Sequence, residues 1–130
     1  MSGFDSSFSI SASGMAAQAR RLRVVSENIA NADTPGYRRK QVTFDTLRDA
    51  DGNDGRVSAD KLTLDQTALP RVFDPSNPMA DSTGYFDGSN VNVIVEIADA
   101  REAQRSYEAN LRMFDQTRQM SQSLLDLLRR

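Results

Sequence analysis

The side chains that could carry chemistry in this sequence are almost all carboxylates and cations. The 130 residues include 18 Asp and Glu and 16 Lys and Arg, but no Cys and no His. Their absence excludes disulfides, thiol nucleophiles, zinc sites of the Cys/His kind and imidazole acid–base catalysis. A Ser nucleophile would lack its usual base for the same reason. Pairs of carboxylates are therefore the remaining candidates for catalytic residues. Without Cys, the sequence does not indicate whether the protein works in an oxidising or a reducing compartment.

One acidic run has part of the spacing of a calcium loop. Asp49-Ala-Asp-Gly-Asn-Asp54 resembles the opening of an EF-hand loop, but Asp54 stands where Gly is needed and Asp60 where Glu is needed. Turn-forming residues continue to Gly55, which favours a solvated turn. Nothing marks any two carboxylates as a glycosidase-like pair. We therefore expect no catalytic residue, no metal site and no cofactor.

The cations form two short groups rather than a binding surface. Arg20, Arg21 and Arg23 make one group, and residues 38–40 make the other. Six cations with few aromatic residues among them are typical of a helix surface paired with acidic neighbours. The net charge is only -2. We therefore expect no nucleic-acid partner.

The hydrophobic content argues against both a large core and a membrane span. Apolar residues make up 38% of the chain, and Trp is absent. No apolar run reaches the ~18 residues that a spanning helix needs, so we expect no direct membrane insertion. Residues 1–10 are Ser-rich and lack the basic and apolar regions of a cleaved signal peptide. If the chain leaves the cytoplasm, we expect a route without one.

Two amphipathic stretches, one toward each end, carry the strongest periodicity. Apolar residues recur there every seven residues, which predicts a narrow seam along one side of each helix. Such a seam needs a partner helix, either the chain's own second helix or that of a neighbouring copy. We therefore expect part of the burial to come from other subunits. The expected assembly seam is Met15, Leu22, Val25, Ile29, Ala103, Tyr107, Leu111, Phe114, Leu124 and Leu128.

Local signals bound the first helix. We expect it to start near Ser6 or Ser7, both adequate N-caps, and to run to about Asn31. Thr34–Tyr37 follows, with Pro and Gly at the central positions of a type II turn. The chain is therefore expected to leave the helix at this turn.

The middle of the chain lacks helical periodicity. Gln41–Phe44 is a strand candidate, and turn residues are frequent around it. Asn90 or Asn92 then caps a second helix that runs to about Leu128. The expected fold is mainly α: long N- and C-terminal helices paired as a coiled coil, with a small β or irregular module between them. The expected domains are residues 1–37, the N-terminal helix; 38–91, the outer module; and 92–130, the C-terminal helix.

Two motifs resemble those of a known family. The segment Ser26–Tyr37, SENIANADTPGY, closely resembles the N-I-A-N-x-x-T-x-G-Y motif of bacterial flagellar axial proteins, the rod and hook subunits. Arg105–Leu111, RSYEANL, resembles the Y-x-A-N motif of the same superfamily. One motif closes the first helix and the other lies inside the second. With the helices that carry them, they cover about half of the chain.

Length and the third quarter of the chain narrow the resemblance. Hook and distal-rod subunits are much longer, which leaves the short proximal-rod proteins. Ala80–Phe86, residues 90–93 and Ile97–Ala103 resemble the FlgC family rather than the related FlgB family. This chain has Ser76-Asn-Pro78 where that family usually has Gly-His-Pro.

The resemblance implies a structural subunit of the flagellar basal-body proximal rod, which polymerises through its terminal helices into a helical drive-shaft tube. The implied partners are copies of itself, other proximal and distal rod proteins, and the flagellar type III export apparatus. The implied location is the rod within the periplasm. Phe4 and Phe8 resemble a short export element of such subunits. The implied helix-stop and register motif is Asn28, Ile29, Ala30, Asn31, Thr34, Pro35, Gly36, Tyr37, Tyr107 and Asn110.

Two other classes of function stay open from the residues alone. A soluble helical adaptor or export chaperone of the same secretion system would share the amphipathic ends, but it should lack the helix-stop motif and a separate β module. A small hydrolase would need a cleft lined by an Asp/Glu pair.

Overall fold

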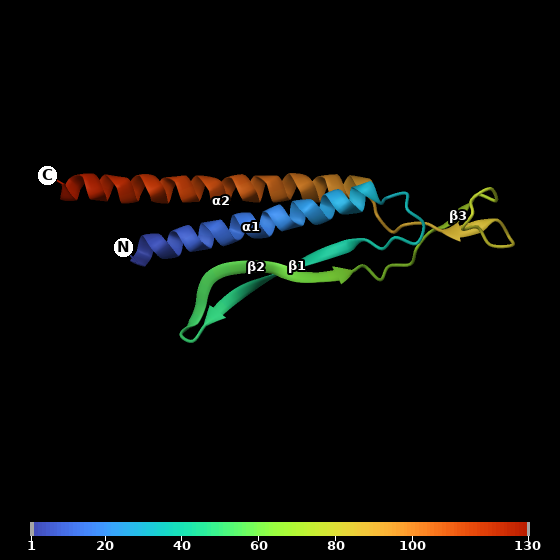
Figure 1. Ribbon diagram of the computed structural model, residues 1–130, viewed down its shortest axis with the longest axis horizontal. Helices are drawn as coiled ribbons and strands as arrows, with labels where there is room; N and C mark the ends of the chain where they lie inside the picture. The colour runs from blue at the N-terminus through green and yellow to red at the C-terminus, as the bar shows by residue number, and fades with distance from the viewer. Residues whose placement is uncertain (1, 130) are drawn as a thin grey trace.

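The computed structural model describes residues 2–129, and two long helices account for most of it. The elements are α1 (Ser2–Ala30), β1 (Lys40–Asp49), β2 (Gly52–Leu64), β3 (Arg71–Phe73), β4 (Tyr85–Asp87) and α2 (Val93–Leu128). The helices lie side by side and antiparallel, and the hairpin of β1 and β2 lies along α1 (Figure 1). The loops with β3 and β4 extend beyond the end where α1 stops. The expected combination of two long helices and a small β module is confirmed.

The start of α1 differs from the expectation. The helix begins at Ser2, so the start expected at Ser6 or Ser7 is wrong by four or five residues. Contacts with α2 explain the added turn: Phe4 lies in a groove with Met120 and Leu124 of α2. Packing of an apolar face stabilises helical residues that have little helical propensity of their own.

The end of α1 is as expected. Tyr37 donates its backbone N–H to the carbonyl of Thr34 over 3.2 Å, and Gly36 between them has φ of 74°. This is the geometry of a type II turn, in which Gly accepts the left-handed conformation without strain. Before the turn, the side chain of Asn31 donates to the carbonyl of Glu27 over 2.9 Å, in addition to the bond of 3.1 Å that this carbonyl accepts from the Asn31 backbone N–H.

The second helix is the longer of the two. The side chain of Asn92 accepts a hydrogen bond from the backbone N–H of Ile94, which confirms one of the two expected N-caps. α2 has 36 residues and α1 has 29. At ~1.5 Å per residue, α2 is about 54 Å long, and its last turns extend past the N-terminus of α1 (Figure 1).

The strands form two separate antiparallel pairs. In the longer pair Val42 lies opposite Leu62, and the register shifts twice toward the hairpin turn. The strand expected at Gln41–Phe44 is therefore part of a ten-residue strand. In the shorter pair Val72 lies opposite Phe86. Each pair is too small to be stable without packing on another element.

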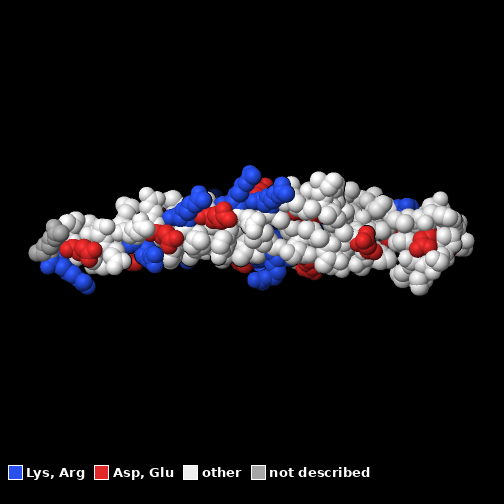
Figure 2. Space-filling model, turned by 90° about the horizontal axis from the view of Figure 1, so that it is seen from above, with Lys and Arg blue, Asp and Glu red and all other residues white. Residues whose placement is uncertain are grey.

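Few apolar side chains are buried within the chain. Among the described residues, the buried apolar ones are Ala17, Val25, Ala59 and Ala103. Buried polar residues are at least as prominent, and Glu96 and Asn28 are the largest fully buried side chains. Seen over α2, charged residues of both signs are spread along the helical part, whereas the end with β3 and β4 is mostly uncharged (Figure 2). Polar contacts must therefore specify much of this arrangement.

Candidate functional site

The best-defined cluster lies where α1 ends, β1 begins and α2 begins. Its centre is Asn28, which is 1% exposed. Its side-chain Nδ2 donates to the carbonyl of Lys40 over 2.9 Å, and its Oδ1 accepts the backbone N–H of Lys40 over 2.9 Å. Oδ1 also accepts the hydroxyl of Tyr37 over 2.8 Å. The side-chain amide of Asn28 on α1 thus pairs with both backbone groups of Lys40, the first residue of β1, as the backbone of a neighbouring strand would.

A buried ion pair completes the cluster from the side of α2. Glu96 is 0% exposed, and Nδ2 of Asn28 donates to its Oε2 over 3.3 Å. Nε of Arg39 pairs with the other carboxylate oxygen. Nη2 of Arg39 reaches Oδ2 of Asp99 over 2.9 Å, and Asp99 also pairs with Arg21 over 3.4 Å. Because both oxygens of Glu96 are satisfied, its burial is tolerable.

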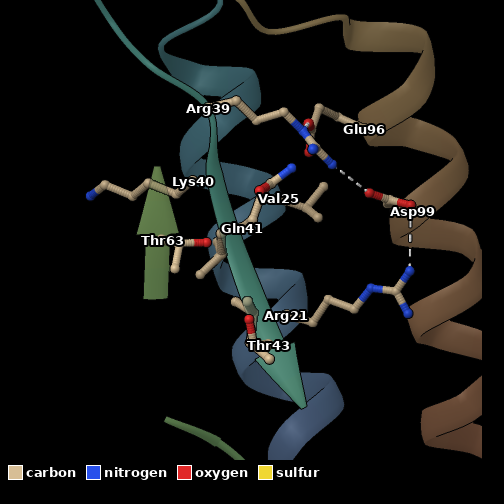
Figure 3. Close-up of a pocket in the computed structure, with 11 residues that line it drawn as sticks. Arg21, Val25, Arg39, Lys40, Gln41, Thr43, Thr63, Glu96 and Asp99 are labelled. Atoms are coloured by element: carbon tan, nitrogen blue, oxygen red, sulfur yellow. Dashed lines mark hydrogen bonds and ion pairs between the residues drawn. The ribbon is translucent and has the colours of Figure 1, made fainter. Parts of the chain in front are cut away.

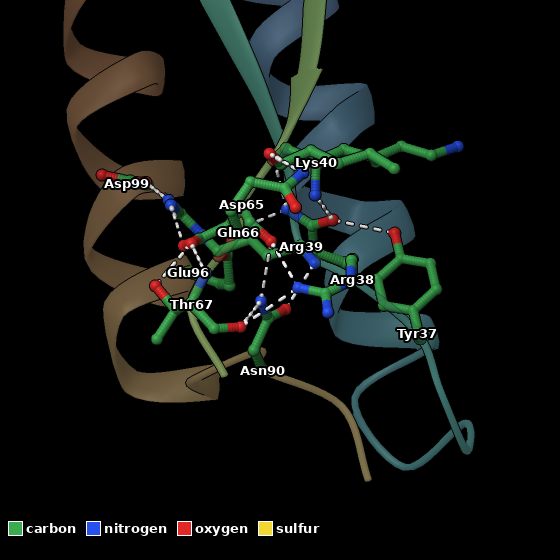
Figure 4. Close-up of polar contacts among 12 residues, drawn as sticks. Tyr37, Arg38, Arg39, Lys40, Asp65, Gln66, Thr67, Asn90, Glu96 and Asp99 are labelled. Atoms are coloured by element: carbon green, nitrogen blue, oxygen red, sulfur yellow. Dashed lines mark hydrogen bonds and ion pairs between the residues drawn. The ribbon is translucent and has the colours of Figure 1, made fainter. Parts of the chain in front are cut away.

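Loop residues hold Arg39 from the opposite side (Figure 4). Its backbone N–H donates to Oδ1 of Asn90 over 2.6 Å, and its carbonyl accepts the N–H of Asp65 over 2.8 Å. The amide of Asn90 donates to the carbonyls of Asp65 and Thr67 over 3.0 and 3.2 Å. We call this cluster the polar junction; it comprises Asn28, Tyr37, Arg39, Lys40, Asp65, Asn90, Glu96 and Asp99.

Within the polar junction, the pKa values of Arg39 and Tyr37 are both raised. Burial alone would lower the pKa of Arg39, but the hydrogen bond and charge of Glu96 raise it above its usual value. Burial raises the pKa of the Tyr37 hydroxyl, and Glu27 adds to this while Lys40 opposes it. Arg39 therefore stays charged and Tyr37 stays a neutral donor at ordinary pH.

A groove of about 310 Å³ runs beside the polar junction, between β1 and α2. Arg21 and Arg39 reach Asp99 along one side of it, and Gln41, Thr43 and Thr63 come from the hairpin (Figure 3). Its charged side chains are all in ion pairs: four pair with one another, and Lys40 pairs with Glu27 outside the lining. The lining has no nucleophile beside a base. The groove therefore has the features of a hydrated gap between packed elements.

The expected seam residues lie in different surroundings. Val25 and Ala103 are buried, and Met15, Leu22 and Phe114 are partly buried. The rest are exposed in the single chain: Ile29, Tyr107, Leu111, Leu124 and Leu128. The contact between α1 and α2 also uses other positions, because Asn110 lies directly against Gly14. The exposed residues remain available to neighbouring chains, so the assembly seam stays a prediction.

The helix-stop motif divides into two groups. Asn28 and Tyr37 belong to the polar junction, and the hydroxyl of Thr34 donates to the side chain of Asn31 over 3.1 Å. Pro35 and Gly36 make the turn, while Ile29 and Ala30 are exposed on the last turn of α1. In the second motif Asn110 contacts α1, but Tyr107 is 36% exposed.

The two Phe residues expected to act in export are helical and packed. Phe4 lies beside the C-terminal part of α2, and the Phe8 ring lies 4.9 Å from that of Phe114, between ring centroids. Nothing in these contacts separates an export role from a packing role.

Sequence reasoning missed the ion pair of the polar junction. Glu96 and Arg39 lie 57 positions apart, so no local pattern connects them. Glu is almost never fully buried unless paired, and composition alone therefore places it on the surface. One signal was available: Glu96 precedes Ala103, Asn110 and Thr117 at steps of seven, along the face of α2 that is buried against α1.

Metal-ligand clusters and membrane-spanning helices are absent from the described part of the chain. Among the described residues, which exclude the side chains of Asp49 and Asn53 in the acidic run, no three Asp or Glu side chains are placed to hold a metal ion. The described helices include none with the length and apolar character of a membrane span.

Comparisons with known proteins give a consistent result. Residues 8–38 match the family model described as flagella basal body rod protein, and residues 82–127 match the flagellar basal body rod FlgEFG protein C-terminal model. The flagellar basal-body rod protein FlgC of Agrobacterium fabrum is 49% identical over 92% of this chain and 91% of its own length. The FlgC protein of Salmonella typhimurium is 35% identical, covering 92% of this chain and 94% of the relative. That of Bacillus subtilis is 33% identical, covering 93% and 95%.

Proposed function

Because this chain belongs to the FlgC family of flagellar basal-body rod proteins, we propose that it polymerises through its terminal helices in the proximal part of the rod. The chain is a structural subunit of the flagellar rod and not an enzyme, as its relatives are structural rod proteins. These matches do not favour the alternative of a helical adaptor or export chaperone.

The observation that carries the proposal is the amount of apolar surface left open on the helices. Leu124 is 46% exposed, Leu111 is 42% and Leu128 is 81%, while few apolar side chains are buried inside the chain. A monomer with so many exposed large apolar residues on long helices is typical of a protein that completes its burial in an assembly.

We further propose that α1 and α2 form a coiled coil in the assembled rod. Their antiparallel contact is supported at successive positions by Phe8 with Phe114, Gly14 with Asn110, and Arg21 with Glu102. The seven-residue repeat then leaves the larger seam residues for helices of neighbouring subunits. Contacts that repeat between unlike surfaces build an open helical polymer rather than a closed ring.

The proposed partners follow from this role. They are copies of the chain itself and other proximal and distal rod proteins in a hetero-polymer, with the β module facing outward. The rod lies within the periplasm, and the subunit reaches it through the flagellar type III export apparatus without a cleaved signal peptide. The Ser-rich composition around Phe4 and Phe8, which has low intrinsic helical propensity, supports a role for them in that passage.

Charge placed on the predicted assembly seam, at exposed Leu124 and at partly buried Leu22, tests the proposal. Leu124→Asp and Leu22→Asp are introduced into a strain that lacks its own copy of the subunit, and swimming and rod formation are measured. Burying an unpaired carboxylate costs several kcal/mol, and a polymer repeats that cost at each subunit. We expect both variants to abolish rod assembly and motility.

A matched control adds the same charge elsewhere. Ala50→Asp places a carboxylate in the exposed turn between β1 and β2, within the segment Asp49–Gly55, and is expected to leave swimming unchanged. Circular dichroism of Leu124→Asp should match the parent chain, because Leu124 is exposed in the single chain. Normal motility in the Leu124→Asp strain would refute polymerisation through this surface.

A further inference from the structure

The β3–β4 tip, residues 71–87, presents apolar side chains at one end of the molecule (Figure 1). Phe73 is 61% exposed, and Met79 is 68% exposed. In the part of the chain that the structure describes, neither β3 nor β4 packs against a helix. The chain itself therefore leaves this apolar surface uncovered, which is typical of a surface that contacts another molecule.

Contacts within the β3–β4 tip hold this surface in one shape. The rings of Phe73 and Tyr85 lie 5.0 Å apart between centroids, and a Cβ added to Gly84 would lie only 2.8 Å from the Phe73 ring. Arg71 pairs with Asp81 over 2.6 Å, and Asp81 also accepts the backbone N–H of Tyr85 over 3.1 Å. A surface that is already ordered loses less conformational entropy when it binds.

The opposite end of the molecule has an apolar groove of about 500 Å³, which we call the end groove. Phe4 of α1 and Met120, Leu124 and Leu127 of α2 form its apolar lining, and Gln and Ser residues line the rest. α2 extends past the N-terminus of α1 at this end (Figure 1), so α1 leaves these three α2 side chains exposed. The end groove therefore has room for side chains of another molecule.

The β3–β4 tip and the end groove carry opposite charge around uncharged centres. Residues 71–87 include three Asp and one Arg, whereas residues 112–130 include four Arg and two Asp. The residues that line the end groove are all uncharged. An apolar centre with charges of opposite sign around it favours a specific contact between the two surfaces. Because they lie at opposite ends of the long axis (Figure 1), they can meet only between two copies of the chain.

We propose that the β3–β4 tip of one copy docks in the end groove of a second copy, with Phe73 and Met79 as its apolar contacts. The two surfaces differ, so a docked pair still has one free tip and one free end groove. The contact therefore repeats head to tail and builds an open row of copies instead of a closed dimer. This inference rests on the polymerisation proposed above and names a contact that joins subunits along their long axis.

Disulfide cross-linking of the purified full chain tests this contact. The sequence has no Cys, so a thiol can be introduced at one exposed position at a time: Met79→Cys in the β3–β4 tip and Ser123→Cys in the end groove. The two variants, one of them tagged, are mixed in equal amounts and oxidised. The control mixture contains Gln104→Cys, at an exposed position of α2 outside the end groove, in place of Ser123→Cys. We expect the mixed disulfide to form about tenfold faster than in the control, a preference of ~1.4 kcal/mol.

A charge placed in the end groove makes the test specific. Gln119→Glu, added to the Ser123→Cys chain, brings a carboxylate close to the acidic tip and should lower cross-linking to the control rate. Gln104→Glu adds the same charge outside the end groove and should leave the cross-linking rate unchanged. Both positions are exposed, so the circular dichroism of both variants should match that of the parent chain.

Three results would each overturn this contact: predominant homodimers, mixed cross-linking at the control rate, or undiminished cross-linking with Gln119→Glu. None of them bears on polymerisation itself, which the swimming of the Leu22→Asp strain tests separately. Leu22 belongs neither to the lining of the end groove nor to the β3–β4 tip, so failure of this contact and failure of polymerisation are distinguishable.

Discussion

The side chain of Asn110 on α2 fills the space where a side chain at Gly14 of α1 would be. A Cβ added to Gly14 would lie 2.5 Å from Oδ1 and 2.7 Å from Cγ of Asn110. The Nδ2 of Asn110 donates to the carbonyl of Ser106 one turn earlier, which holds the amide in this position. The glycine therefore has a packing role that offsets its low helical propensity.

Gly14→Ala should destabilise the helix pair although alanine is the better helix former. Overpacking costs about 1–3 kcal/mol, and the gain in propensity returns about 1 kcal/mol, so we expect a net loss near 1 kcal/mol. Urea unfolding followed by circular dichroism measures the change. Gly14→Ala combined with Asn110→Ala should recover the loss, whereas Gly3→Ala, where the added Cβ meets nothing within 4 Å, should not destabilise. If Gly14→Ala were as stable as the variant with both substitutions, the close packing of Asn110 against Gly14 would not limit the residue at position 14.

Asn28→Ala should be among the most damaging single substitutions in the chain. It leaves both backbone groups of Lys40, the hydroxyl of Tyr37 and part of Glu96 without partners. Each buried polar group left unpaired costs ~1–3 kcal/mol, so we expect a loss of about 3 kcal/mol or more. Thermal unfolding of the purified chain measures it.

Asn31→Ala is the matched control for that substitution. The side chain of Asn31 donates to the carbonyl of Glu27 and accepts the hydroxyl of Thr34, both at the solvent-facing end of α1. Its loss should cost no more than about 1 kcal/mol, because water replaces both bonds. Equal losses of stability for Asn28→Ala and Asn31→Ala would show that the buried hydrogen bonds of Asn28 contribute no more to stability than the exposed ones of Asn31.

The helix ends could be predicted from sequence because their causes are local. Pro35 and Gly36 determine the turn that ends α1, and Asn92 caps α2 with its own side chain. The start of α1 could not be placed correctly, because Phe4 is held in the helix by residues more than a hundred positions away. Local preference is a weak guide where tertiary packing decides.

The polar junction could not be predicted from the sequence either, because its contacts also join residues that are far apart in the chain. Asn28 was recognised as part of a motif, but its partners Lys40 and Glu96 come from two other elements. Periodicity places Glu96 and Asn110 on the buried face of α2, but neither composition nor periodicity identifies Arg39 and Gly14 as their partners. A polar group becomes a stable part of an interior only when the fold brings all of its partners together.

The hydroxyl of Tyr37 should make stability depend on alkaline pH. Burial raises its pKa above the usual value of about 10, and the charges of Glu27 and Glu96 raise it further while that of Lys40 lowers it. The folded chain then holds this proton more tightly than the unfolded chain. The stabilisation is complete below about pH 10 and is lost as pH rises through the higher pKa of the folded state.

Tyr37→Phe isolates this contribution. It removes the hydroxyl and should lower stability near neutral pH by about 1 kcal/mol, the net value of one hydrogen bond. Unfolding free energies of both chains, measured from pH 8 to pH 12, should converge as the parent loses its advantage. Parallel curves across that range would show that the Tyr37 proton is not coupled to folding.

Export of the chain tests Phe4 and Phe8 apart from their packing in the folded subunit. If the export apparatus takes the chain unfolded, contacts such as that of the Phe8 ring with Phe114 do not exist during passage. We expect Phe4→Ala with Phe8→Ala to reduce secretion from a strain that cannot polymerise rods, because the exporter would lose its apolar contact. Phe114→Ala removes the same ring pair from the other side and should be secreted like the parent. Secretion of the double variant at the parent level would assign both residues to packing alone, in the contacts with α2 that the folded chain shows.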